Sequence, residues 1–223
     1  MGANSRWYAG SGINRHVWLK EFAPIHIAQW GTYITTPKIS ASSAEINIKT
    51  KVQNETSKSA TITVENKILN SKGIEVAKSF SMKTIAANNE NEFADFAIVR
   101  SPELWSTENP GLYKLITKTF VDGKLTDQAE NKFGVRKIYF DVSNGFMLND
   151  KPMKLKGGCF HIDNGLLGAR PYDRAEIRRV TLMKASGYNA IRCSHKPPAP
   201  AFLDACDSLG MLVTDEAFDC WNE

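Results

Sequence analysis

Hydrophobic and polar positions alternate along much of the chain between residues 32 and 135. Ile46 and Ile48 are separated by a polar residue, and so are Ile62 and Val64 further on. A period of two indicates strands with one buried face. Clusters of Asn, Ser, Lys and Gly separate about seven such runs, which is typical of an immunoglobulin-like β-sandwich. We therefore expect residues 32–135 to form an immunoglobulin-like β-sandwich domain.

A different pattern occupies residues 136–223. Three short apolar runs, expected as strands at residues 155–160, 189–193 and 211–214, end in polar residues, and helical segments lie between them. Strands that alternate with helices favour parallel pairing. This order predicts the first three βα units of an incomplete TIM (β/α)8 barrel, in which functional side chains follow the C-terminal ends of the strands.

Local signals predict two helices in this part. Asp173 followed by Glu176 has the spacing of a capping box, in which the first residue caps the helix. Ile177, Val180 and Met183 continue it as an apolar stripe. A second helix is expected over residues 200–209, because a proline opens it and a glycine follows it.

A hairpin is expected ahead of the first barrel strand. The turn signal Asn149-Asp150-Lys151-Pro152 separates residues 146–148 (FML) from residues 153–155 (MKL). Such a turn between two short, mostly apolar runs predicts paired antiparallel strands.

Composition excludes several classes of protein. The chain has 223 residues, 42% hydrophobic and 23% charged, with a net charge of +4 and no basic block, so nucleic acid is not expected as a partner. No apolar run is long enough for a membrane span. The first residues lack the apolar segment of a signal peptide, so the compartment stays open, and a periplasmic or secreted parent is compatible with the sequence. Four cysteines without metal-ligand spacing are expected to be buried free thiols: Cys159, Cys193, Cys206 and Cys220.

Candidate chemistry sits at the ends of the three predicted barrel strands. His161 follows the first strand and His195 follows the second. Arg192 ends the second strand, where it can face a substrate or form an ion pair with Asp215 or Glu216. Adjacent strand residues face opposite sides, so these two carboxylates do not form a catalytic acid/base pair. A metal site built from His161, His195 and Asp215 is a weaker alternative, because the spacing is not a ligand signature.

Several motifs in order resemble glycoside hydrolase family 2, the β-galactosidase and β-glucuronidase family. The resemblance covers most of the chain. It rests on residues 10–19 (GSGINRHVWL, with Asn14 in place of the usual tyrosine), 103–115, 133–138 (FGVRKI), 149–152 (NDKP) and 189–195 (NAIRCSH).

The resemblance implies a domain order and residue roles. Residues 1–31 would be the C-terminal tail of a jelly-roll sugar-binding domain. His161 and His195 would contact the sugar beside the scissile bond, and Arg192 would shape the same pocket. Cys220 stands where some relatives have a magnesium-ligating glutamate, so no metal or other cofactor is expected. The substrate-binding residues implied in this chain are thus His161, Arg192 and His195.

The same resemblance implies that catalytic residues are missing. Retaining glycosidases need two carboxyl groups about 5–5.5 Å apart. In the family these are glutamates on the fourth and seventh barrel strands, and this chain has neither strand. Asn222-Glu223 spells the family's catalytic dipeptide but follows the third strand directly, so we reject the match. We expect a fragment of a retaining, β-galactosidase-like hydrolase that is inactive alone, with no catalytic residue in this chain.

Two other functions stay open at this point. The β-sandwich can be a carbohydrate- or protein-binding module, or the barrel part can belong to a metal-dependent hydrolase. The expected partner is the β-linked carbohydrate substrate of the parent enzyme, with no nucleic acid and no membrane. An incomplete barrel leaves unpaired strand edges, so residues 136–223 are expected to self-associate with another copy, to become partly disordered or to pack against the sandwich.

Overall fold

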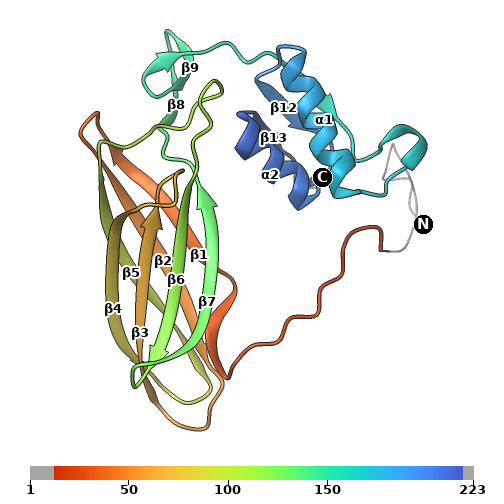
Figure 1. The fold of residues 1–223 in the computed structure, drawn as a ribbon. Coiled ribbons are helices and arrows are strands. Elements are labelled where there is room, and N and C mark those ends of the chain that lie inside the picture. Colours follow the sequence, from red (N-terminus) through yellow and green to blue (C-terminus); the bar gives the residue numbers. More distant parts are fainter. Residues whose placement is uncertain (1–12, 218–223) are drawn as a thin grey trace. The chain divides into compact units, whose positions relative to one another are not determined.

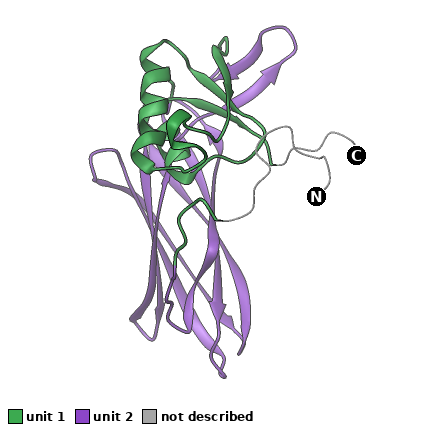
Figure 2. Ribbon diagram, turned by 90° about the vertical axis from the view of Figure 1, so that its right-hand side faces the viewer, with its two compact units in different colours: residues 1–18, 106–110, 153–223 green, residues 19–105, 111–152 purple. Residues whose placement is uncertain are grey.

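The structure, a computed structural model, describes residues 13–217 (Figure 1). The chain forms two compact units, coloured separately in Figure 2. Unit 1 comprises Met1–Trp18, Ser106–Pro110 and Met153–Glu223, and unit 2 comprises Leu19–Trp105 and Gly111–Pro152. The sequence features at residues 1–12 and 218–223, among them Cys220 and Asn222-Glu223, lie outside the described residues.

Unit 2 contains the predicted β-sandwich. One antiparallel sheet has the order β1-β2-β5, built from Ile25–Ile39, Ser43–Asn54 and Asn89–Arg100. The other has the order β4-β3-β6-β7, built from Glu75–Ile85, Ala60–Leu69, Tyr113–Val121 and Lys124–Phe133. The strand β1 runs across the boundary expected between residues 31 and 32.

Alternation along the strands explains the core of the sandwich. Ile46 and Ile48 on β2 are fully buried, while Asn47 between them is only partly buried. Ile68 on β3 and Leu115 on β6 are buried in the same apolar cluster, so residues from both sheets fill one core. Burying such side chains stabilises the fold by about 1.5–3 kcal/mol each. The predicted sandwich is confirmed.

The hairpin differs from the prediction in its second strand. Strands β8 (Ile138–Asp141), β9 (Gly145–Leu148) and β10 (Lys151–Pro152) form a small antiparallel sheet in unit 2. Asn149 and Asp150 have φ angles of 52° and 63°. Two successive residues with positive φ make the tight turn typical of hairpins. Pairing therefore resumes at Lys151, opposite Leu148, rather than at residues 153–155.

Unit 1 contains the predicted βα units. Strands β11 (Gly157–Phe160), β12 (Ala190–Cys193) and β13 (Leu212–Asp215) pair in parallel. A short 3-10 helix, η1 (Gly165–Leu167), and the helix α1 (Asp173–Ala185) connect β11 to β12, and α2 (Pro200–Leu209) connects β12 to β13. Figure 1 shows both α-helices beside this small sheet. Their apolar residues form one cluster with those of β12, as the start of a barrel requires. The first barrel strand begins at Gly157, later than predicted.

The predicted capping box at α1 is wrong. Tyr172 occupies the cap position and makes no side-chain cap bond, and Asp173 is the first helical residue. Glu176 does not reach back to the cap but is buried, whereas Ile177 is 47% exposed. Val180 and Met183 of the predicted apolar stripe are buried as expected, and Glu176 takes the buried position that was predicted for Ile177.

In the described residues no helix is long and apolar enough to cross a membrane.

One loop is held tightly against the end of α2. Lys184 Nζ donates to the carbonyl oxygen of Thr107 at 2.5 Å and to that of Gly210 at 3.0 Å. Gly210 has a φ of 75°, and a Cβ added there would lie 2.3 Å from the Thr107 oxygen. Glycine at this position is therefore required both by its backbone conformation and by the close approach of the loop.

We expect Gly210→Ala to destabilise unit 1 more than Gly187→Ala does. Both glycines have positive φ, but a Cβ at Gly187 would meet nothing within 4 Å. The left-handed backbone should cost about 1–2 kcal/mol in each variant. The clash with Thr107 should add about 1–3 kcal/mol in Gly210→Ala alone. Urea unfolding followed by amide hydrogen exchange in residues 153–217 measures both. Equal losses would contradict the tight packing of this loop.

Candidate functional site

The register of the parallel sheet aligns the candidate residues. Cys159 on β11 is level with Arg192 on β12, which is level with Thr214 on β13. Residues level with one another in a parallel sheet share a face. Ile191 and Cys193 are buried in the apolar cluster with the helices, so Arg192 faces the other side of the sheet. This arrangement follows from the alternation of apolar and polar residues along β12.

Glu216 connects two of the three predicted site residues. Its Oε1 forms an ion pair with Arg192 Nη2, and its Oε2 lies 2.9 Å from His195 Nδ1. The hydrogen bond from His195, followed by that from Arg192, lowers the pKa of Glu216 below its ordinary value. An ionised carboxylate only accepts hydrogen bonds, so His195 Nδ1 carries the proton in this pair. Of the two partners expected for Arg192, the ion pair is with Glu216.

His161, the remaining predicted site residue, lies beside His195. The ring centroids of His161 and His195 are 5.6 Å apart, with the ring planes inclined at 59°. The structure thus brings His161, Arg192 and His195 together at one edge of the sheet. The carboxylate of Asp215 instead accepts the backbone N–H of Glu216, as expected for neighbours that point to opposite sides.

Cys159 was predicted to be buried but is exposed. Its Sγ lies 3.6 Å from Arg192 Nη1. The nearby Ser194 hydroxyl and then Arg192 lower the pKa of this thiol. In contrast, burial raises the pKa of Cys193 to about 12 and also raises that of Cys206. Cys159 is level with Arg192 in the sheet and shares its exposed face. The residue type alone had suggested that this cysteine is buried.

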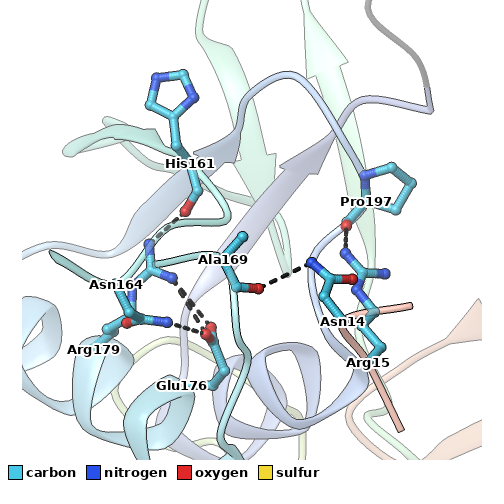
Figure 3. A network of polar contacts seen from close by, with 8 residues as sticks. All are labelled: Asn14, Arg15, His161, Asn164, Ala169, Glu176, Arg179 and Pro197. Atoms are coloured by element: carbon cyan, nitrogen blue, oxygen red, sulfur yellow. Dashed lines mark hydrogen bonds and ion pairs between the residues drawn. The ribbon is translucent and has the colours of Figure 1, made fainter. Parts of the chain in front are cut away.

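A polar network behind the β11 tip escaped the sequence analysis (Figure 3). Arg179 donates to the backbone carbonyl of His161 at 2.6 Å and pairs with Glu176 at 3.3 Å. Glu176 also accepts a hydrogen bond from Asn164 Nδ2 at 2.6 Å. The side chain of Glu176 is only 4% exposed. The spacing of Glu176 and Arg179 at i, i+3 on one helix was the available signal.

The segment that resembles the family's jelly-roll motif contacts the loops of this site. Asn14 Nδ2 donates to the carbonyl oxygen of Ala169 at 3.0 Å, and Arg15 donates to that of Pro197 (Figure 3). His16 Nε2 lies 2.9 Å from the carboxylate of Asp173. The first two contacts join the N-terminal segment to the loops that follow β11 and β12, and the third joins it to the start of α1.

The weaker alternative of a metal site is not supported in residues 13–217. Within this range no group of three or more His, Cys, Asp and Glu side chains is placed to hold a metal ion. His161, His195 and Asp215 therefore do not form such a site.

Comparison with known proteins gives one consistent family. The sequence model of "Glycosyl hydrolases family 2" matches residues 25–136, and that of "Glycosyl hydrolases family 2, TIM barrel domain" matches residues 141–219. The β-galactosidase BoGH2A of Bacteroides ovatus is 41% identical over 99% of this chain, which covers 26% of that protein. A β-glucuronidase of Formosa agariphila is 30% identical over 91% of this chain, which covers 22% of it.

Solved structures agree with these sequence matches. A glycosyl hydrolase family 2 member from Bacteroides cellulosilyticus superposes with a TM-score of 0.94 at 45% identity, over 100% of this chain and 29% of that one. The β-glucuronidase of Bacteroides uniformis superposes with a TM-score of 0.83 at 33% identity, over 88% of this chain and 24% of that one. The chain therefore spans about a quarter of the length of these relatives.

We expect the Glu216 carboxyl to titrate below the ordinary range for glutamate. Because its folded pKa is lowered, the stability it contributes is present above the unfolded pKa and is lost as the pH falls through the folded pKa. Carboxyl ¹³C NMR of glutamate-labelled protein measures the midpoint. His195→Phe should raise it, whereas Lys196→Met, which removes a charge from the same loop, should leave it unchanged. A midpoint that is the same in wild type and in His195→Phe would refute the pairing.

We also expect Cys159 to be alkylated by iodoacetamide well before Cys193 and Cys206, because the thiolate is the reactive form. The measurement uses a Cys220→Ser background at mildly alkaline pH, with peptide mass spectrometry to locate the label. Arg192→Met should slow labelling of Cys159 and leave the two buried thiols unaffected. Similar rates at all three cysteines would contradict the described environment.

Proposed function

The chain belongs to glycosyl hydrolase family 2, and on this premise we propose that unit 1 provides one wall of a sugar-binding pocket in a retaining β-glycosidase. His161, Arg192 and His195 form that wall. The observation that carries the proposal is the carboxylate of Glu216, which holds Arg192 and His195 in fixed positions beside His161. Fixed donors and acceptors at an exposed edge suit the hydroxyl groups of a sugar ring, because each hydroxyl both donates and accepts.

We propose a neutral β-galactoside as the sugar, in preference to a β-glucuronide. The charge of Arg192 is balanced by its ion pair with Glu216, so the wall has little net positive charge with which to attract a substrate carboxylate. The relative with 41% identity is named a β-galactosidase, which agrees with this choice. Recognition would then depend on hydrogen-bond geometry rather than on net charge.

We further propose that the chain alone does not hydrolyse glycosides. A retaining mechanism needs a carboxylate nucleophile and a carboxylic acid about 5–5.5 Å apart. Glu216 is poorly suited to be the acid, because its neighbours lower its pKa and keep it ionised. Both of its oxygens are engaged by Arg192 and His195, which also weakens it as a nucleophile. Asp215 belongs to the opposite side of the strand.

We expect the purified chain to release no nitrophenol from 4-nitrophenyl β-galactoside or 4-nitrophenyl β-glucuronide. Turnover that co-purifies with the chain and is lost in Arg192→Ala would overturn the inactivity. In saturation-transfer NMR at millimolar sugar, methyl β-galactoside should contact the protein and methyl β-glucuronide should not. Arg192→Ala should abolish that contact, and Lys49→Met, an exposed cation in unit 2, should preserve it. Preference for the glucuronide would refute the proposed sugar.

A further inference from the structure

We propose that Arg179, held by Glu176, is a positioning residue that fixes the direction in which the His161 side chain leaves the β11 tip. The inference deepens the proposed function and rests on it, because it concerns how a proposed sugar contact is held in place. Neither residue lies among the side chains of the proposed wall. Both act from α1, behind the loop that carries His161 (Figure 3).

The network holds both ends of a four-residue loop. Arg179 Nη2 donates to the carbonyl oxygen of His161 at 2.6 Å, and Asn164 Nδ2 donates to Glu176 Oε1 at 2.6 Å. Arg179 Nη1 lies 3.3 Å from Glu176 Oε2 and joins the two contacts. The first and last residues of the loop are therefore tied to the same ion pair.

The peptide groups on both sides of His161 are fixed as a result. Before it, the carbonyl oxygen of Phe160 accepts the N–H of Ser194 at 2.9 Å. After it, the carbonyl of His161 is held by Arg179. With both peptide planes fixed, the Cα–Cβ bond has one direction. In Figure 3 the carbonyl points toward Arg179 and the imidazole ring points the opposite way. The ring of His195 lies 5.6 Å from that of His161.

Because this ion pair is buried, a contribution to stability alone does not explain it. The side chains of Arg179 and Glu176 are 16% and 4% exposed. Removing two charges from water is expensive, and well-packed apolar residues in place of a buried ion pair are often neutral or stabilising. The guanidinium also lies over the rings of Phe160 and Phe202, at 4.6 and 5.8 Å, so apolar packing partners are already present. What apolar residues would lack is a donor to the His161 carbonyl and an acceptor for Asn164.

The test compares the full chain with a double variant, Glu176→Leu plus Arg179→Met, which replaces both charges with apolar side chains. Arg178→Met is the matched control, because Arg178 is an exposed arginine adjacent to Arg179 on the same helix. The Hε1–Cε1 NMR resonance of His161 reports on the ring. Exchange of the Asn164 amide, which donates to the carbonyl oxygen of Gly168 at 2.8 Å, reports on the loop. Urea unfolding of each protein reports on stability.

We expect the double variant to keep its unfolding midpoint, to shift the His161 resonance, and to exchange the Asn164 amide roughly tenfold faster or more, as the loss of a charged hydrogen bond allows. The Arg178→Met variant should match wild type in all three measurements. An unshifted His161 resonance with unchanged exchange in the folded double variant would overturn the inference. If the double variant does not fold, Glu176→Gln plus Arg179→Met carries the test with the same two readings, because it keeps an acceptor for Asn164 and removes the donor to the His161 carbonyl.

A sugar titration separates this inference from the proposed function. Methyl β-galactoside is added to wild type and to the double variant while the His161 resonance is followed. A wild-type resonance that does not respond to sugar, together with a resonance that shifts in the double variant, supports the positioning role and refutes the proposed sugar contact. A response to sugar that is equal in both proteins overturns the positioning role and supports the sugar contact.

Discussion

Parallel registration of β11, β12 and β13 is the constraint on which the candidate site depends. It places Cys159 level with Arg192 and sets the residues that follow each strand at one edge of the sheet. Only in this register can one carboxylate, that of Glu216, reach residues from β12 and from the loop after it. Apolar packing of α1 and α2 against the other face maintains the register, because a shift by one residue would turn Arg192 into the apolar cluster.

Two ion pairs lie near the strand ends and differ in how exposed they are to solvent. Arg192 and Glu216 lie at an exposed edge, where an ion pair contributes little to stability because water screens it. Glu176 and Arg179 lie behind the loop, largely out of water, where leaving either partner alone would be strongly destabilising. The outer pair therefore orients side chains that stay accessible, and the inner pair orients the backbone from which one of them projects.

Sequence patterns predicted the helices and strands well, and predicted which of their residues are buried less well. The alternation that contains Ile46 and Ile48 predicted the sandwich because the buried face of a strand is set by the period alone. On α1 the predicted stripe was correct at Val180 and Met183. Ile177 was wrongly assigned to the core, where Glu176 is buried instead with Asn164 and Arg179 as partners. Those partners come from a neighbouring loop and from the next turn of the helix. A hydrophobicity pattern cannot predict a buried carboxylate whose hydrogen-bond and ion-pair partners compensate for the loss of water.

The partners through which Glu216 positions Arg192 and His195 also make it poorly suited to catalysis. A general acid must hold a proton near neutral pH, and a nucleophile needs a free oxygen. His195 and Arg192 stabilise the ionised form and occupy both oxygens of Glu216. In the proposed enzyme, binding and bond cleavage are thus separated between different strands: a charge-balanced wall fixes the sugar by hydrogen-bond geometry, and carboxyl groups outside this chain would act on it. Such a division keeps the wall neutral, so that it does not disturb the pKa difference that two catalytic carboxyl groups must maintain.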